Sequence, residues 1–252
     1  MRNKKLIIFD LDGTLAPSKS PMDADMSGLL SDLLRTRMVA VISGGSLAQF
    51  QKQFLGSLNA APELLKNLYL FPTCGAAFYR YKESSGAWQC VYTEALTADE
   101  KVRAGSAFTK AFRDLNHKHP ETLYGDVLED RGTQVTFSAL GQRAPLPLKA
   151  AWDPDSKKRL RIAEAVQKYI PDLEVRVGGT TSIDITRPGV DKAYGIKKME
   201  EYLGVTKAEM LFVGDAIFPG GNDYPPKAMG VDCVPVENPD DTKGLIRTLL
   251  VV

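Results

Sequence analysis

The chain has 252 residues, 44% of them hydrophobic, so it is long enough to bury a core in one large domain or two smaller ones. Its 32 basic and 31 acidic residues leave a formal net charge of +1, which excludes a global field that would attract nucleic acid or an anionic membrane. Three widely spaced cysteines and two histidines form no zinc-binding pattern. The apolar run before Asp10 is too short for a signal peptide, and nothing approaches membrane-spanning length, so we expect a cytoplasmic protein.

Strands and helices are predicted to alternate over the first 71 residues. Buried strands are expected at 6–9, 38–42 and 68–71. Helices are expected at 26–34 and from residue 47, where apolar residues recur at helical spacing. This order is typical of a parallel sheet wrapped by helices.

The pattern changes near residue 75 to hairpins with two amphipathic helices between them, which indicates an inserted α+β module. Buried parallel-strand character returns at 210–213 and 231–236, with a helix at 192–202 between the insert and these strands. The predicted fold class is therefore α/β, with a Rossmann-like parallel-sheet core and an inserted α+β cap. We expect the core to span 1–80 and 188–252 and the cap to span 81–187.

Two carboxylates follow the first strand directly. Asp10 and Asp12 would point to opposite sides of a strict strand, but the turn at Gly13 lets both reach one cation and one phosphoryl group. The alternative is a strand that ends in an Asp-Gly turn with solvated carboxylates.

A second set of polar residues follows other strands. Asp215 and Asp223 come after the strand at 210–213, Ser43 follows the strand at 38–42, and Lys192 lies in the helix after the insert. Ligands of α/β sheets bind at the carboxyl ends of the strands, so these residues are candidates for one crevice. Asp10, Asp12, Asp215 and Asp223 offer the oxygen ligands that Mg²⁺ prefers. Taken singly, Ser43 would be a helix cap and Lys192 a solvated lysine.

The chain resembles the haloacid dehalogenase superfamily, because all four of its motifs occur in order. Asp10 to Thr14 match the first motif, Ser43 the second, Lys192 the third, and Gly214-Asp215 with Asn222-Asp223 the fourth. The insert resembles the large α+β cap of the type IIB members, and the likeness is greatest to eukaryotic-type phosphomannomutases and sugar phosphatases.

This resemblance implies a Mg²⁺-dependent reaction on a small phosphorylated substrate. Asp10 would attack phosphorus and form an aspartyl phosphate, while Asp12 would act as acid and base. Lys192 would offset charge on the phosphoryl oxygens, and Ser43 with the backbone of Gly44 and Gly45 would bind them. Asn222 is expected to contact the phosphate or substrate. A homodimer through the cap is compatible with this resemblance, and no nucleic acid or membrane partner is expected.

The cap carries the expected substrate-binding residues, which are Arg131, Gln142, Arg143, Ser182 and Asp184. Phosphomannomutases place further arginines in the cap to hold the far phosphate of a sugar bisphosphate, but this chain has Gln142 and Lys149 where two of them align. Arg143 is one residue out of register, which would place it on the other face of a strand. The alternative for Arg131, Ser182 and Asp184 is an ordinary sheet surface with polar cross-strand pairs.

Because fewer phosphate donors in the cap favour hydrolysis, the sequence predicts a phosphatase that acts on a sugar phosphate. A phosphomannomutase-like isomerase is the alternative. A non-catalytic module that binds a phosphorylated ligand is the third reading, although degeneration should first remove Asp10, Asp12 or Lys192, and all three are present.

Overall fold

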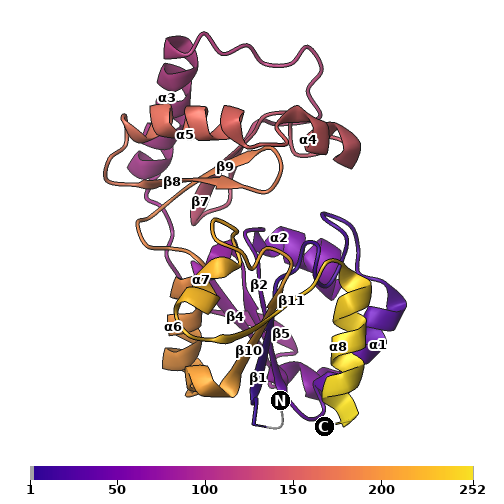
Figure 1. The fold of residues 1–252 in the computed structure, drawn as a ribbon. Coiled ribbons are helices and arrows are strands. Elements are labelled where there is room, and N and C mark those ends of the chain that lie inside the picture. Colours follow the sequence, from indigo (N-terminus) through magenta and orange to yellow (C-terminus); the bar gives the residue numbers. More distant parts are fainter. Residues whose placement is uncertain (1–2, 252) are drawn as a thin grey trace. The chain divides into compact units, whose positions relative to one another are not determined.

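In the computed structural model, which describes residues 3–251, the chain divides into two compact units (Figure 1). The core unit runs through Thr93 and resumes at Val190, whereas the cap unit is the inserted segment Glu94–Gly189. A mixed sheet with helices on both faces forms the core, and a smaller antiparallel sheet with helices forms the cap. The predicted α/β fold class with an inserted α+β cap is confirmed.

The core sheet has seven strands in the order β11-β10-β1-β2-β3-β4-β5. The first five of these are parallel to one another, and β4 pairs antiparallel with both β3 and β5. The strands are β1 (Leu6–Phe9), β2 (Met38–Ile42), β3 (Leu68–Phe71), β4 (Ala77–Lys82), β5 (Ala87–Thr93), β10 (Met210–Gly214) and β11 (Asp232–Pro235). The predicted parallel strands are therefore present, within one or two residues of their expected ends.

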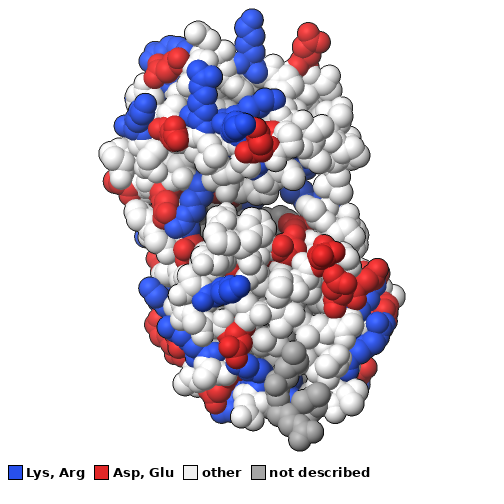
Figure 2. Space-filling model, viewed as in Figure 1, with Lys and Arg blue, Asp and Glu red and all other residues white. Residues whose placement is uncertain are grey.

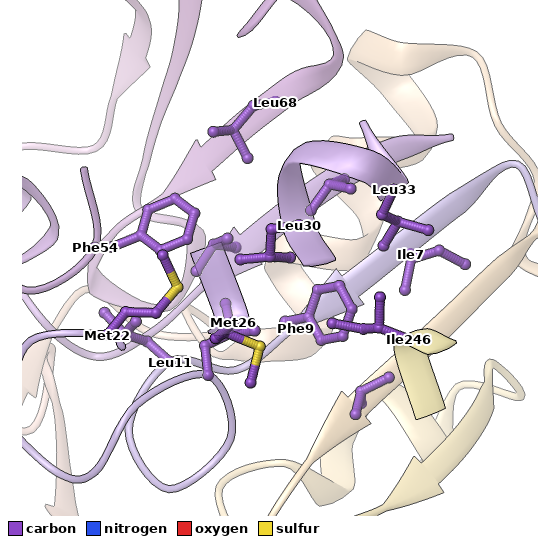
Figure 3. Close-up of a cluster of buried hydrophobic side chains, with 14 of the residues drawn as sticks. Ile7, Phe9, Leu11, Met22, Met26, Leu30, Leu33, Phe54, Leu68 and Ile246 are labelled. Atoms are coloured by element: carbon purple, nitrogen blue, oxygen red, sulfur yellow. The ribbon is translucent and has the colours of Figure 1, made fainter. Parts of the chain in front are cut away.

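Both faces of the parallel sheet are buried, which explains why its strands are apolar without alternation. On one face, Ile7 and Phe9 pack against α1 (Ala24–Leu33) and α8 (Pro239–Val251) (Figure 3). On the other face, Leu6 and Ile8 pack with α6 (Lys192–Leu203). The remaining helical segments of the core are α2 (Leu47–Phe50), a π-helix (Gln51–Leu55), α7 (Tyr224–Ala228) and 3-10 turns at Pro62–Asn67, Thr73–Gly75 and Lys207–Glu209.

The structure moves the start of the cap from residue 81 to Glu94. The predicted hairpin forms, but β4 pairs antiparallel with β3 and thereby extends the core sheet. Phe78 of this hairpin stacks on Phe71 with ring centroids 4.6 Å apart. A short turn is enough to place a strand antiparallel to the strand before it, so β4 can join the edge of the core sheet beside β3. The change from parallel to antiparallel pairing therefore does not mark a domain boundary.

The cap sheet has four antiparallel strands in the order β6-β7-β9-β8. Its apolar face, with Phe137 and Ile183, packs against α3 (Ala98–Asp114) and α5 (Lys157–Gln167). Thr97 and Glu100 form a capping box at the start of α3. The other elements are β6 (Leu128–Asp130), β7 (Gln134–Ser138), α4 (Leu146–Trp152), β8 (Glu174–Gly178) and β9 (Ser182–Thr186).

Charges of both signs are interspersed on the face shown in Figure 2, in keeping with the formal net charge of +1. Within residues 3–251, none of the helices is both long and apolar enough to cross a lipid bilayer.

Candidate active site

The polar cluster lies at the carboxyl edge of the core sheet, where β1 and β10 end side by side. Residues Leu6 to Phe9 pair in parallel with Met210 to Val213, and the amide of Asp10 donates to the carbonyl of Val213 at 2.9 Å. Asp10 therefore follows the last residue of β1, and Asp215 follows the last residue of β10. Parallel pairing in this register brings the two carboxylates to the same edge.

Three carboxylates and one lysine form the centre of the site. Oxygens of Asp10, Asp215 and Asp223 lie within 4.8 Å of one another. Lys192, the first residue of α6, donates from Nζ to Oδ1 of Asp10 at 2.5 Å and also to Oδ1 of Asp223. Lys192 and Asp223 are fully buried, Asp10 is almost so, and Asp215 is the exposed member. The other oxygen of Asp223 accepts a hydrogen bond from the amide of Ala216 at 3.1 Å.

Two glycines lie where any larger residue would clash with the carboxylates of this cluster. Gly13 has φ of +83°, and a Cβ atom there would lie 2.3 Å from Oδ2 of Asp215. A Cβ atom on Gly214 would lie 2.4 Å from Oδ2 of Asp223. Only glycine fits these two positions without a shift of the carboxylates. Gly13 is favoured in addition by its positive φ in the turn after Asp12.

The electrostatics of the cluster favour an added cation. Burial raises the pKa of Asp10 well above its usual value, against the opposing effect of Lys192. Although part of Asp215 is exposed, partial desolvation of its carboxylate beside the cluster and the neighbouring Asp223 raise its pKa to about 6. Burial alone would lower the pKa of Lys192, but Asp10 and Asp223 hold it above its usual range. Because three carboxylates face a single ammonium group, a divalent cation with a preference for oxygen ligands fits the donor set.

The carboxylate of Asp12 does not join this group, so the turn at Gly13 does not bring both motif carboxylates to one cation, and a contribution of Asp12 to the metal site through its carbonyl oxygen stays a prediction. Among the described side chains, Oδ1 of Asp12 accepts hydrogen bonds from Gln53 Nε2 at 2.8 Å and from the Lys19 amide at 2.7 Å. Its Oδ2 accepts from Gln49 Nε2 at 3.1 Å. Gln49 and Gln53 were not predicted as site residues. Two amide side chains four residues apart, just after the Ser43 turn, are the signal that could have pointed to them.

The Ser43 turn follows β2 at the same edge of the sheet. Ser43 is buried, and its hydroxyl oxygen accepts from the amide of Gly45 at 3.2 Å. The amide of Cys74 donates to the carbonyl of Ser43 at 2.8 Å, and the amide of Thr73 donates to the carbonyl of Gly45 at 2.9 Å. Thr73 and Cys74 have φ values of +48° and +57°, a strained conformation for residues other than glycine. The strained segment thus fixes the backbone of the turn.

Gly44 and Gly45 lie in this turn, with Gly44 partly exposed and Gly45 buried. Asn222 is exposed in the turn that immediately precedes Asp223. Asn222 therefore flanks Asp223 of the cluster and the two glycines flank Ser43, and the contact of both segments with a phosphate stays a prediction.

In the cap unit, several predicted substrate-binding residues share the polar face of the sheet. Oδ1 of Asp184 accepts hydrogen bonds from the hydroxyl of Thr136 at 2.7 Å and from the side-chain Nε2 of Gln134 at 3.1 Å. Ser138 and Ser182 are opposite each other in β7 and β9, with their hydroxyl oxygens 3.4 Å apart. Gln142 donates from Nε2 to the hydroxyl of Ser138 at 2.9 Å, which brings it into the same network.

Arg131 and Arg143 lie outside the strands. Arg131 precedes β7 and pairs with Glu129, with 2.8 Å between Nε and Oε2. Arg143 is exposed in a turn after β7, so the expectation that it lies on the opposite face of a strand is wrong. Together with Gln142 and Glu129, it lines a cavity of about 310 Å³.

Comparison with solved structures shows the class of fold. The chain superposes on a haloacid dehalogenase-like hydrolase from Bacteroides thetaiotaomicron with a TM-score of 0.59 and 15% sequence identity, covering 98% of this chain and 99% of that one. For the IMP-nucleotidase of Plasmodium falciparum, the TM-score is 0.73 at 16% identity, with 98% of this chain and 70% of that chain covered. The chain therefore shares its fold with these two proteins.

The chain belongs to the eukaryotic phosphomannomutase family, whose profile matches residues 26–252. It is similar to the phosphomannomutase of Schizosaccharomyces pombe, with 27% identity over 95% of this chain and 91% of that protein. The phosphomannomutase of Encephalitozoon cuniculi is 28% identical over the same shares of the two chains. The family profile begins after Asp10 and Asp12, but the pairwise matches cover nearly the whole chain.

Proposed function

We propose that this protein is a Mg²⁺-dependent phosphoryl-transfer enzyme that acts on a sugar phosphate, with phosphomutase activity as the primary reaction. The observation that carries the proposal is the cluster of Asp10, Asp215 and Asp223 around buried Lys192, in a chain that is similar to phosphomannomutases over nearly its full length. This similarity favours the mutase alternative over the phosphatase that the sequence predicts.

The chemistry can be assigned to Asp10 of the cluster and to Asp12. A carboxylate oxygen of Asp10 attacks phosphorus, a new Asp10–phosphorus bond forms, and the bond between phosphorus and the sugar oxygen breaks. Asp12 gives a proton to the departing oxygen. In the second half-reaction, Asp12 removes a proton from the incoming hydroxyl group, which attacks the same phosphorus and releases Asp10. That hydroxyl belongs to the sugar in a mutase and to water in a phosphatase.

Charge stabilisation supplies most of the expected rate enhancement. Asp10, Asp215 and Asp223 would hold Mg²⁺, which neutralises negative charge on the phosphoryl oxygens when bound. Lys192 adds a fixed positive charge beside Asp10. Ser43 and the amides of its turn offer donors to one phosphoryl oxygen.

Phosphatase activity is the second candidate, and the cap residues favour it. The neutral amide of Gln142 binds Ser138, and Lys149 is buried, with its Nζ 2.9 Å from the carbonyl of Gln142. If these residues replace phosphate-binding arginines, a bisphosphate intermediate is held less firmly and water reaches the aspartyl phosphate more easily.

The two reactions can be separated with mannose 1-phosphate in the presence of Mg²⁺, with and without a hexose 1,6-bisphosphate, by ³¹P NMR. We expect the 6-phosphate isomer to form faster than free phosphate once the bisphosphate is added. Free phosphate without isomer would assign a phosphatase. No turnover of any sugar or aryl phosphate would favour the non-catalytic reading, and full turnover in excess chelator would contradict the metal assignment.

A further inference from the structure

The hydrogen bonds around the Asp12 carboxylate have a consistent direction. Gln49 uses one Nε2 hydrogen for Asp12 and the other for the side-chain oxygen of Gln53, at 3.0 Å. Gln53 donates to the other oxygen of Asp12. These two amides and the backbone N–H of Lys19 are all donors, so they hold Asp12 through its acceptor oxygens.

The local backbone is arranged around these two glutamines. They lie four residues apart across the junction of α2 with the π-helix, and widened turns of this kind often occur at functional sites. Gln53 is 3% exposed, and its carbonyl accepts from the amide of Met22, in the loop after the first motif. A Cβ atom on Gly45 would lie 2.5 Å from Oε1 of Gln49, so the Ser43 turn leaves room for this amide. Burying an amide is costly unless it is hydrogen-bonded, and here the partner is Asp12.

The position of Asp12 in the sequence makes such a restraint necessary. It lies two residues after Asp10, near a site whose three carboxylates would hold a cation. A carboxylate that coordinates a cation is not available to donate or accept a proton. A side chain that must transfer protons next to a metal site therefore needs competing partners.

We propose that Gln49 and Gln53 are positioning residues that hold the Asp12 carboxylate away from the metal ligands and thereby keep it available for proton transfer. This inference rests on the proposed function. It assigns to two residues outside the four motifs the task of separating the proton-transfer carboxylate from the metal-binding ones.

The test uses Gln49→Met, Gln53→Met and the double variant, which retain side-chain length and lose the donors. Gln51→Met is the matched control, because Gln51 is exposed in the same π-helix. Two measurements are made on each protein. Mn²⁺ binding is followed by electron paramagnetic resonance, and single-turnover phosphorylation of Asp10 is followed with a sugar phosphate and with a nitrophenyl phosphate, whose leaving group needs no proton.

We expect the double variant to bind Mn²⁺ several-fold more tightly, because Asp12 becomes a further ligand. Phosphorylation by the sugar phosphate should slow by roughly 10²-fold, the low end of what a general acid contributes, and phosphorylation by the nitrophenyl ester should stay within about twofold. Gln51→Met should match the wild type. In an Asp12→Asn background, the glutamine substitutions should have no further effect on the sugar phosphate reaction.

Equal losses with both substrates, or Mn²⁺ affinity that is unchanged or weaker, would assign the pair a purely structural role and overturn the inference. Gln49→Met alone keeps the test decisive if the double variant does not fold, because Gln49 is only partly buried. A wild-type protein that neither binds Mn²⁺ nor becomes phosphorylated would overturn the proposed function and this inference with it. An active wild-type protein whose glutamine substitutions have no effect would overturn this inference alone.

Discussion

The carboxyl edge of the core sheet and the polar face of the cap sheet are both rich in hydrogen bonds, but they differ in charge. The core edge concentrates three carboxylates and a fully buried lysine. The cap face carries hydroxyl and amide groups around Asp184, together with the ion pair of Arg176 and Glu174, which is partly exposed. Charges that are buried together shift one another's pKa values and stabilise charge in a transition state, whereas a partly exposed network of hydroxyl, amide and paired charged groups discriminates substrates by matching their hydroxyl groups. We therefore expect core substitutions to change chemistry and cap substitutions to change recognition.

The largest expected effect is that of Asp10→Asn in the core. The amide keeps the shape of the carboxylate but removes the nucleophile and one metal ligand, so turnover of every phosphate ester should be abolished. Mass spectrometry of the protein after brief exposure to substrate should detect a phosphorylated wild-type protein and no phosphorylated variant. Asp32→Asn, an exposed change in α1, is the control. Residual activity above a few per cent would exclude Asp10 as the nucleophile.

Lys192→Met should have the next largest effect, because it removes the cation from between two buried carboxylates. We expect a loss of about 2.7–4 kcal/mol of transition-state stabilisation with both sugar and aryl phosphates. We also expect the protein without metal to lose about 3 kcal/mol of unfolding free energy, since breaking a buried ion pair leaves uncompensated charge. Saturating Mg²⁺ should restore part of that stability.

Thermal unfolding with and without Mg²⁺ measures this stability difference, and steady-state kinetics measures the rate loss. Lys197→Met is a matched control, because Lys197 is exposed on the same helix. Wild-type kinetics in the Lys192 variant would assign this lysine a structural role, and a stability loss that Mg²⁺ does not reduce would contradict the placement of the cation.

Most of the core could be predicted from the sequence, because its strands are apolar runs whose parallel pairing places Asp10, Ser43 and Asp215 at one edge. The side-chain partners of Asp12 could not, because they lie 37 and 41 residues away and their orientation depends on how a short π-helix packs. The cap boundary was missed for a related reason. Whether the hairpin that follows β3 joins the core depends on tertiary contacts such as the stacking of Phe78 on Phe71.

In the cap, Arg131→Ala should alter recognition and leave the chemistry intact. The KM for the sugar phosphate should rise roughly ten- to hundredfold, as expected for loss of a charged hydrogen bond to substrate. Turnover of a small aryl phosphate should be unchanged, because that substrate has no sugar to recognise. Arg161→Ala, an exposed change on α5, is the control. Parallel losses with both substrates would mean that Arg131, through its pair with Glu129, supports the fold of the cap and not binding.

The smallest expected effect is a pH dependence of cap stability at His117. This ring stacks on Phe112 with centroids 4.7 Å apart, and its Nε2 is buried without a hydrogen-bond partner among the described residues. Burial, with a smaller contribution from His119, lowers the pKa of His117 below its usual 6.5. As the pH falls, the unfolded chain therefore takes up the proton before the folded chain does. The contribution of neutral His117 to the free energy of unfolding is complete above about pH 6.5 and is lost as the pH falls toward the pKa of the folded state.

Unfolding by urea at several pH values, read from the fluorescence of Trp152 of the cap in a Trp88→Phe background, should show this decline. His117→Phe keeps the ring stacking and removes the titration, so it should flatten the profile; an unchanged slope would assign the acid sensitivity to other groups.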